Sequence, residues 1–262
     1  MLSWLAAAPA PAPADEVPAG AAELVALRTR GTVQVSYLLL PSDAPAAVAL
    51  LFPGGDGVVD LERLGRTTPG DRGNFLVRSR EMLHTPELAV AVLDAPSDRR
   101  SRGMDDDFRA GPEHRIDVSA VLADLRARFP AARLFLVGTS RGTVSAAHLG
   151  AALGDSVDGV VLSSSILRAT RGGRGLDGFD LGSIRAPLLL VHHAGDGCPA
   201  CPYDRARALA GRFPLVTVQG GRPPASDACG PLSAHGYYGR EAQTIAAIRA
   251  WILGQPYPSA VE

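Results

Sequence analysis

Residues 134–142 read Leu-Phe-Leu-Val-Gly-Thr-Ser-Arg-Gly, four apolar residues followed by the pattern Gly-x-Ser-x-Gly. The apolar run is typical of a buried strand, and residues 141–153 are compatible with a helix. A serine in a tight turn between strand and helix forces its neighbours into close approach, so Gly138 and Gly142 are needed on either side. We therefore expect the turn to expose the hydroxyl of Ser140 above the edge of a sheet.

The rest of the chain repeats this alternation of short apolar runs and helix-compatible segments. In residues 113–129, Val118, Val121 and Leu125 recur at the spacing of one helical face. Short strands that are apolar throughout indicate a parallel sheet with helices on both faces. We expect strands at residues 33–40, 47–52, 88–93, 134–137, 159–162, 187–191 and 215–218, and helices at residues 74–84, 113–129, 141–153, 203–212 and 240–253.

Composition excludes several classes of protein. The chain has 262 residues, 46% of them hydrophobic, which is enough for a sizeable buried core. It has 26 basic residues, all of them arginine, and 27 acidic residues, so the formal net charge is -1. No global basic field attracts nucleic acid or a membrane surface, and no apolar run is long enough to cross a bilayer. Because no repeat or linker interrupts the pattern, we expect a single α/β domain over residues 23–262.

Residues 1–22 are rich in alanine and proline, and we expect them to be flexible. They contain Ala-x-Ala-like sites, as an export signal does, but no positively charged leading region. The remnant of an export signal and a simple Ala-Pro tail both stay open. The three cysteines permit one disulfide and one free thiol, which favours an oxidising compartment. We expect a periplasmic or secreted protein, with a cytoplasmic one as the alternative.

The strand, the Gly-x-Ser-x-Gly turn and the following helix resemble the α/β-hydrolase family, and the resemblance extends from Val33 onward. Within this family, the sequence resembles serine esterases and dienelactone hydrolases without a large lid domain. The resemblance implies an α/β-hydrolase fold, with a mostly parallel central sheet and helices on both faces. It also implies that Ser140 is a nucleophile, whereas the alternative is a structural turn flanked by glycines.

In this family the catalytic residues follow the chain order serine, acid, histidine. The resemblance places the acid in a loop after a strand, where Asp196 follows the apolar residues 187–191. His235 is then the one histidine further along the chain, in a loop before the last helix, and a surface histidine is the alternative. A histidine in this role takes the proton of the serine, and the carboxylate holds the ring in the required tautomer.

The oxyanion of a tetrahedral intermediate needs N-H donors, and the backbone of Arg141 supplies one. The glycine-rich loop at residues 53–57 follows the strand that usually supplies the second, and it offers Gly55 or Asp56. Pro53 stands where the family often has a histidine, so the register of this donor stays open. A tight turn without a catalytic role is the alternative for this loop.

Cys198 lies two residues after Asp196, and Cys229 lies six residues before His235. A disulfide between them would join the two loops, and Cys201 would then be the free thiol. The cluster His192, His193, Cys198 and Cys201 suggests zinc instead, but such a site would compete with Asp196 for one loop. We expect the disulfide, no metal and no cofactor.

Other polar residues have structural interpretations. We expect the arginines in and just after the loop at residues 167–182 to be solvated, although they could recognise an acidic substrate group. The acidic run at residues 105–107 lacks the spacing of a calcium loop. Asp94 and Asp98 fit a capping role better than a place in a cleft. Loops 97–111 and 167–182 are interpreted as solvated connections. The arginines concerned are Arg168, Arg171, Arg174 and Arg185.

We therefore expect a serine hydrolase that cleaves small-molecule or polymeric carboxylic esters through an acyl-enzyme. An acyltransferase or a peptidase would use the same three residues, and the sequence does not separate them. A catalytically inactive binding protein on the same fold is a further alternative, disfavoured because Ser140, Asp196 and His235 are all present. The acyl group and the oligomeric state are left open.

Overall fold

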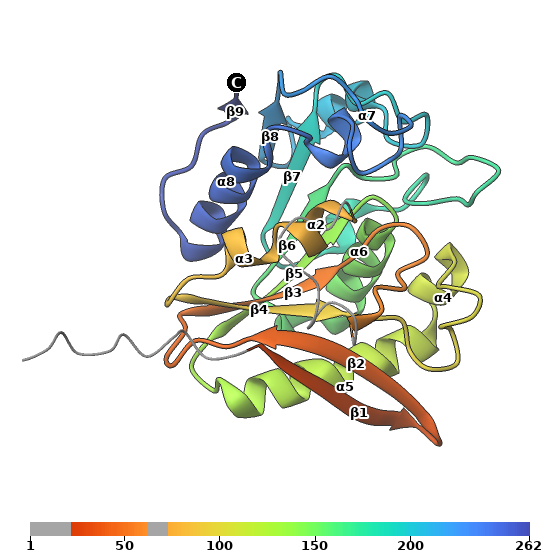
Figure 1. Cartoon of the computed structure of the whole chain (residues 1–262), viewed down its shortest axis with the longest axis vertical. Helices are drawn as coiled ribbons and strands as arrows, with labels where there is room; N and C mark the ends of the chain where they lie inside the picture. The colour runs from red at the N-terminus through yellow and green to blue at the C-terminus, as the bar shows by residue number, and fades with distance from the viewer. Residues whose placement is uncertain (1–21, 62–72) are drawn as a thin grey trace, which may run out of the picture.

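A mixed nine-stranded sheet forms the centre of the computed structural model, which describes residues 22–61 and 73–262 (Figure 1). The first hairpin, β1 with β2, is antiparallel, and β2 also pairs antiparallel with β4. All the other neighbouring strands are parallel. Across the sheet the order is β1 (Glu23–Arg30), β2 (Val33–Leu40), β4 (Leu88–Leu93), β3 (Ala47–Phe52), β5 (Arg133–Thr139), β6 (Gly159–Ser163), β7 (Leu188–His193), β8 (Leu215–Val218) and β9 (Ala260–Val261).

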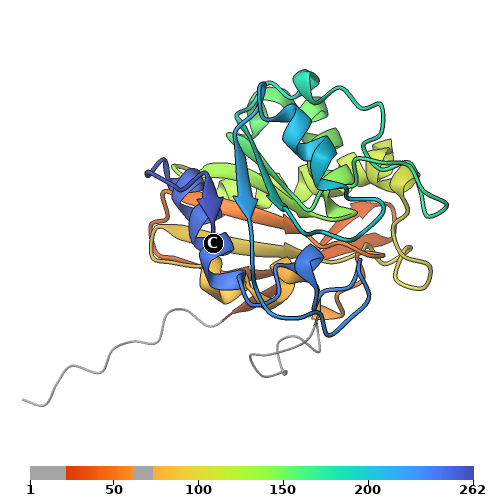
Figure 2. The same ribbon diagram turned by 90° about the horizontal axis from the view of Figure 1, so that it is seen from above.

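Helices cover both faces of this sheet, as Figure 2 shows. One apolar core packs the sheet against α5 (Pro112–Arg128), α6 (Gly142–Leu153) and α7 (Tyr203–Leu209). The second packs it against α2 (Phe75–Arg78), α3 (Arg80–Leu83) and α8 (Glu241–Leu253). Every residue of β3 and β4 is buried, which explains their continuous apolar sequences. The predicted fold class, a mostly parallel sheet with helices on both faces, is confirmed.

Several local predictions were wrong. Residues 74–84 form two short helices, α2 and α3, which meet at Ser79. The segment 97–111 contains α4 (Asp106–Ala110), whose N-terminus is capped by the carboxylate of Asp105. This segment is not a solvated loop throughout, because Arg109 is only 1% exposed. The edge strands β1 and β9 were not predicted.

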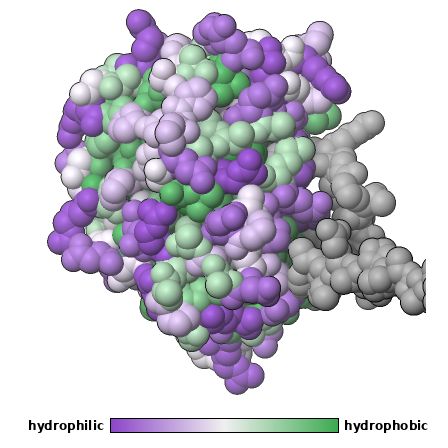
Figure 3. Space-filling model, turned by 90° about the vertical axis from the view of Figure 1, so that its left-hand side faces the viewer, coloured by the Kyte–Doolittle hydropathy of each residue, from purple (hydrophilic) through white to green (hydrophobic). Residues whose placement is uncertain are grey.

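The predicted N-terminal segment, residues 1–22, lies outside the described residues except for its last position. One sheet contains strands from Glu23 to Val261, which supports the proposal of a single domain over residues 23–262. Among the described residues, no helix is long and apolar enough to span a membrane. On the face drawn in Figure 3, hydrophobic residues lie in small groups between hydrophilic ones.

Candidate active site

Ser140 lies at the turn between β5 and α6 with a φ of 51°, a left-handed conformation that is unusual for a residue other than glycine. A Cβ on Gly138 would come within 2.5 Å of the carbonyl oxygen of Gly142. On Gly142 it would come within 1.9 Å of the carbonyl oxygen of Phe52. Backbone contacts therefore require both glycines, and the close approach predicted from the sequence is present.

Asp196 and His235 are in contact. Asp196 lies in the turn after β7, and its Oδ2 is 2.9 Å from Nδ1 of His235. The Asp196 side chain has no exposed surface, and its Oδ1 accepts a hydrogen bond of 2.9 Å from the N-H of Cys198. Because an ionised carboxylate only accepts, this contact places a proton on Nδ1 and leaves Nε2 of His235 free to accept one.

Ser140 and His235 line the same pocket, which has a volume of about 280 Å³. Within the described residues, no hydrogen bond joins the Ser140 hydroxyl to His235. Such bonds are often long in enzymes without substrate and shorten when a substrate binds. The pocket is lined by Gly54, Gly55, Asp56, Val58, Asn74, Phe75, Thr139, Ser140, Cys229, Pro231, His235 and Gly236.

The loop after β3 packs directly against the serine. A Cβ on Gly54 would lie 2.9 Å from the Cβ of Ser140, so only glycine brings the two backbones this close. Gly55 and Asp56 follow on the pocket wall. In the part of the chain that the structure describes, the N-H groups of Gly55, Asp56 and Arg141 donate no hydrogen bond. These three N-H groups are the ones that the sequence predicted as donors to an oxyanion.

Two residues that were not predicted from the sequence, Ser164 and Tyr237, hold His235 in place. The hydroxyl of Ser164 donates to the carbonyl oxygen of His235 at 2.8 Å. The hydroxyl of Tyr237 donates to the carbonyl oxygen of Val191 at 2.8 Å and accepts from the N-H of Ser164 at 3.0 Å. Tyr237 has no exposed surface, and this burial raises the pKa of its hydroxyl. A tyrosine two residues after the histidine was the one sequence signal for this anchor.

His192 and His193 are engaged by the backbone. Nε2 of His192 donates to the carbonyl oxygen of Cys201 at 2.9 Å, and Nε2 of His193 donates to that of Gly220 at 2.9 Å. Nδ1 of His193 accepts from the N-H of Gly195. Burial lowers the pKa of His192, which favours its neutral form. These contacts explain both histidines without a metal.

The disulfide expected between Cys198 and Cys229 is present, with the two Cα atoms 4.5 Å apart. Cys201 is a buried free thiol, and its burial raises its pKa. The side-chain donor atoms of Cys198, Cys201 and His235 lie within 4.8 Å of one another. Cys198 has no thiolate to offer a metal while the disulfide is intact. The bridge joins the turn of Asp196 to the segment before His235.

Replacing both Cys198 and Cys229 by alanine is expected to lower the free energy of unfolding by about 3 kcal/mol, because the unfolded chain loses a loop constraint. Urea unfolding of the two proteins measures the difference. Cys201→Ala, which keeps the bridge, is the matched control. A double variant as stable as the wild type would show that the bridge contributes nothing to the folded state.

The remaining polar predictions divide into confirmed and wrong ones. The four arginines Arg168, Arg171, Arg174 and Arg185 are exposed, as expected. Asp94 has the predicted capping role, since its carboxylate accepts from the N-H groups of Val59 and Ala95, each at 2.8 Å. For Asp98 the prediction was wrong, because its carboxylate pairs with Arg30 at 3.1 Å.

Comparison with known proteins identifies the fold. The sequence matches no family model, and it matches no curated protein. An α/β serine hydrolase without a lid from Xanthomonas campestris is similar in structure, with 14% identity, a TM-score of 0.56, and coverage of 89% of this chain and 97% of that one. A dienelactone hydrolase from Anabaena variabilis gives 15% identity, a TM-score of 0.57, and coverage of 88% and 95%.

A dipeptidyl peptidase 4 from Porphyromonas gingivalis is also similar, with 12% identity, a TM-score of 0.58, and coverage of 90% of this chain and 35% of that one. The chain therefore has the α/β-hydrolase fold, as its sequence predicted. At these identities the likeness establishes the fold and leaves the reaction to be argued from the site.

Proposed function

We propose that the protein is a serine hydrolase that cleaves carboxylic esters through an acyl-enzyme. The observation that carries the proposal is the pocket that Ser140, on its strained turn, and His235 line together, with the buried carboxylate of Asp196 bonded to His235. A nucleophile, a base and a group that orients the base are the parts that covalent catalysis by serine requires.

In the proposed reaction, Nε2 of His235 takes the proton of the Ser140 hydroxyl as the serine oxygen attacks the carbonyl carbon of the ester. The oxyanion that forms is bound by the N-H of Arg141 and by that of Gly55 or Asp56. His235 then gives its proton to the leaving alcohol, and the acyl group remains on the serine. Water, activated by the same histidine, releases the acid and restores the hydroxyl. Asp196 stabilises the charged ring of His235 at both steps.

The same parts suit transfer of the acyl group to another acceptor, or cleavage of a peptide, as in the similar peptidase. We place ester cleavage first because the similar structures include a dienelactone hydrolase and a hydrolase without a lid. An inactive binding protein would have no use for the strained serine and the buried Asp196–His235 pair. The disulfide supports an oxidising compartment, so we further propose export to the periplasm or the medium.

Labelling with a fluorophosphonate, followed by peptide mapping, tests the proposal. We expect one label per chain, on Ser140, and competition by good ester substrates. A panel of p-nitrophenyl esters of rising acyl length then compares ester cleavage with peptide cleavage and with transfer to added alcohols. Failure to label Ser140 in folded protein would exclude the proposed nucleophile. Labelling with turnover of peptides alone would replace the esterase by a peptidase.

Chelation is expected to leave ester cleavage unchanged, because serine catalysis needs no Lewis acid. The measurement compares turnover before and after dialysis against a chelator, alongside elemental analysis of the purified protein. Stoichiometric zinc, together with loss of turnover on its removal, would assign the cysteine and histidine cluster to a metal instead.

A further inference from the structure

Arg109 is a buried cation whose guanidinium donates hydrogen bonds to uncharged groups. The residue lies on α4 and is 1% exposed, and in the described part of the chain no carboxylate forms an ion pair with it. Burial lowers the pKa of its guanidinium to about 10, so the group stays charged near neutral pH. A buried charge is costly unless hydrogen bonds compensate it, so such a residue requires an explanation.

The partners of this guanidinium lie on the two elements that build the pocket. Its Nη2 donates to the carbonyl oxygens of Pro53 at 3.3 Å and Gly55 at 3.4 Å, both in the loop after β3. Its Nη1 donates to the hydroxyl of Ser145 at 2.9 Å, on α6 directly after the serine turn. Its Nε donates to the carbonyl oxygen of Met104 at 3.2 Å. One side chain thus connects the glycine-rich loop to the helix that begins after Ser140.

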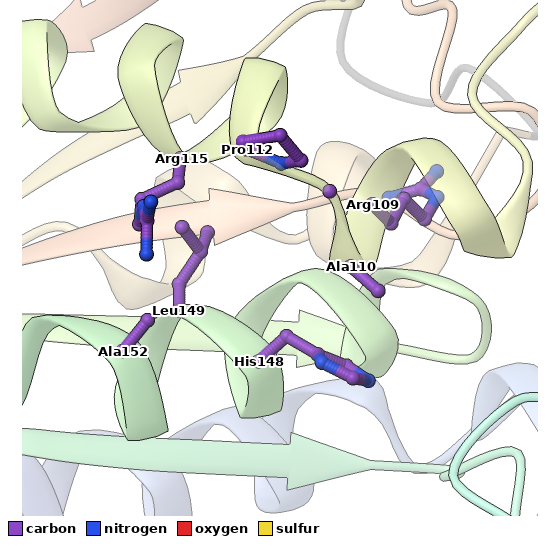
Figure 4. Close-up of a pocket in the computed structure, with 8 residues that line it drawn as sticks. Arg109, Ala110, Pro112, Arg115, His148, Leu149 and Ala152 are labelled. Carbon is purple, nitrogen blue, oxygen red and sulfur yellow. The ribbon is translucent and has the colours of Figure 1, made fainter.

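The loop wraps closely around the guanidinium. A Cβ on Gly57 would come within 2.6 Å of Nη2 of Arg109, so the loop backbone lies directly on this group. Figure 4 shows Arg109 at one end of a second, smaller pocket, with its guanidinium turned away from Arg115, Leu149 and Ala152. The guanidinium therefore binds the loop at residues 53–57 and does not point into that second pocket.

The orientation of the loop's peptide groups follows from these bonds. In a trans peptide, the C=O of one residue and the N-H of the next point in opposite directions, and the described residues contain no cis bond. Because the C=O of Gly55 faces Arg109, the N-H of Asp56 faces away from it. Similarly, the C=O of Gly54 accepts from the N-H of Gly57 at 3.2 Å, which turns the N-H of Gly55 to the opposite side.

We propose that Arg109 is a positioning residue, which holds the loop of Pro53, Gly54 and Gly55 against the serine turn so that its N-H groups are oriented for an oxyanion. The inference rests on the proposed function. The guanidinium suits this task because its planar fork of donors reaches two elements at once, which the single ammonium of a lysine does not. Its charge also lies behind the loop carbonyls, where it polarises the peptide groups toward donation.

The test uses the full chain with Arg109→Met and Arg109→Lys, and p-nitrophenyl acetate as substrate. We expect kcat to fall about 30-fold or more in the methionine variant and about 10-fold in the lysine variant, while KM changes little, because an oxyanion donor acts in the transition state. Affinity for a boronic acid, which forms a tetrahedral adduct with serine, should fall in parallel with kcat. Leu125→Ala on α5 is the control for lost stability alone, since Leu125 is buried and lies in α5, outside the pocket lining.

Three results separate the outcomes. If both arginine variants keep kcat and boronate affinity within threefold of wild type below their unfolding temperatures, the positioning role is wrong. It is also wrong if Leu125→Ala loses as much kcat per folded molecule. Should the methionine variant not fold, the lysine variant and Ser145→Ala decide, and wild-type kcat in both would overturn the inference. Failure of the proposed function appears separately, as a wild type that neither labels at Ser140 nor cleaves esters.

Discussion

Ser140→Ala is expected to lower kcat/KM for esters about a thousandfold or more, because only binding and the oxyanion donors still assist the reaction. The thermal unfolding temperature should stay close to that of the wild type. Alanine keeps the Cβ of Ser140, and the hydroxyl makes no hydrogen bond with the described residues that folding would lose. Steady-state kinetics and a thermal melt of the same preparations give both quantities.

Ser119→Ala is the matched control, since this serine is exposed on α5 and does not line the pocket of Ser140. It should change neither turnover nor unfolding. If Ser140→Ala kept a tenth of wild-type turnover, another residue would be the nucleophile, and fluorophosphonate mapping on that variant would locate it.

Strands that begin or end at a clear change of composition were the easiest elements to predict. Those at 33–40, 47–52, 88–93 and 215–218 have the predicted bounds. Of these four, β3 and β4 are buried along their whole length, in agreement with their continuous apolar sequences. The edge strand β1 (Glu23–Arg30) was missed because its residues are exposed or half-buried and include charged ones. The two residues of β9 are too short to carry a pattern.

The site was predictable where its signal is local and not where it depends on tertiary contacts. Gly138 and Gly142, on either side of Ser140, indicate the turn within a motif of five residues. Asp196 and His235 were found only because the resemblance supplied their order along the chain. Arg109 gave no signal, since its partners are loop carbonyls and a hydroxyl distant in sequence. Because Arg109 follows the acidic run at residues 105–107, its sequence context favours a solvated loop. The fold instead buries the Arg109 side chain in the interior.

Asp196→Asn is the second change for which we expect a very large effect, a fall in kcat of about a thousandfold or more with little change in KM. The carboxylate of Asp196 accepts from Nδ1 of His235 and from the N-H of Cys198, one bond at each oxygen. An asparagine has only one accepting atom. If its oxygen stays on the N-H of Cys198, its amide group faces His235, and Nδ1 must then become an acceptor.

That exchange moves the ring proton of His235 to Nε2, the nitrogen that should receive the proton of Ser140, so the base is lost while the pocket keeps its shape. Asp227→Asn is the control, an exposed carboxylate two residues before Cys229. Kinetics on esters, with ¹⁵N spectra of the imidazole of His235, measure the rate and the tautomer together. We expect Nδ1 to carry the proton in the wild type and in Asp227→Asn, and Nε2 to carry it in Asp196→Asn. A slow Asp196→Asn variant that kept the wild-type tautomer would show that the carboxylate acts mainly through its charge.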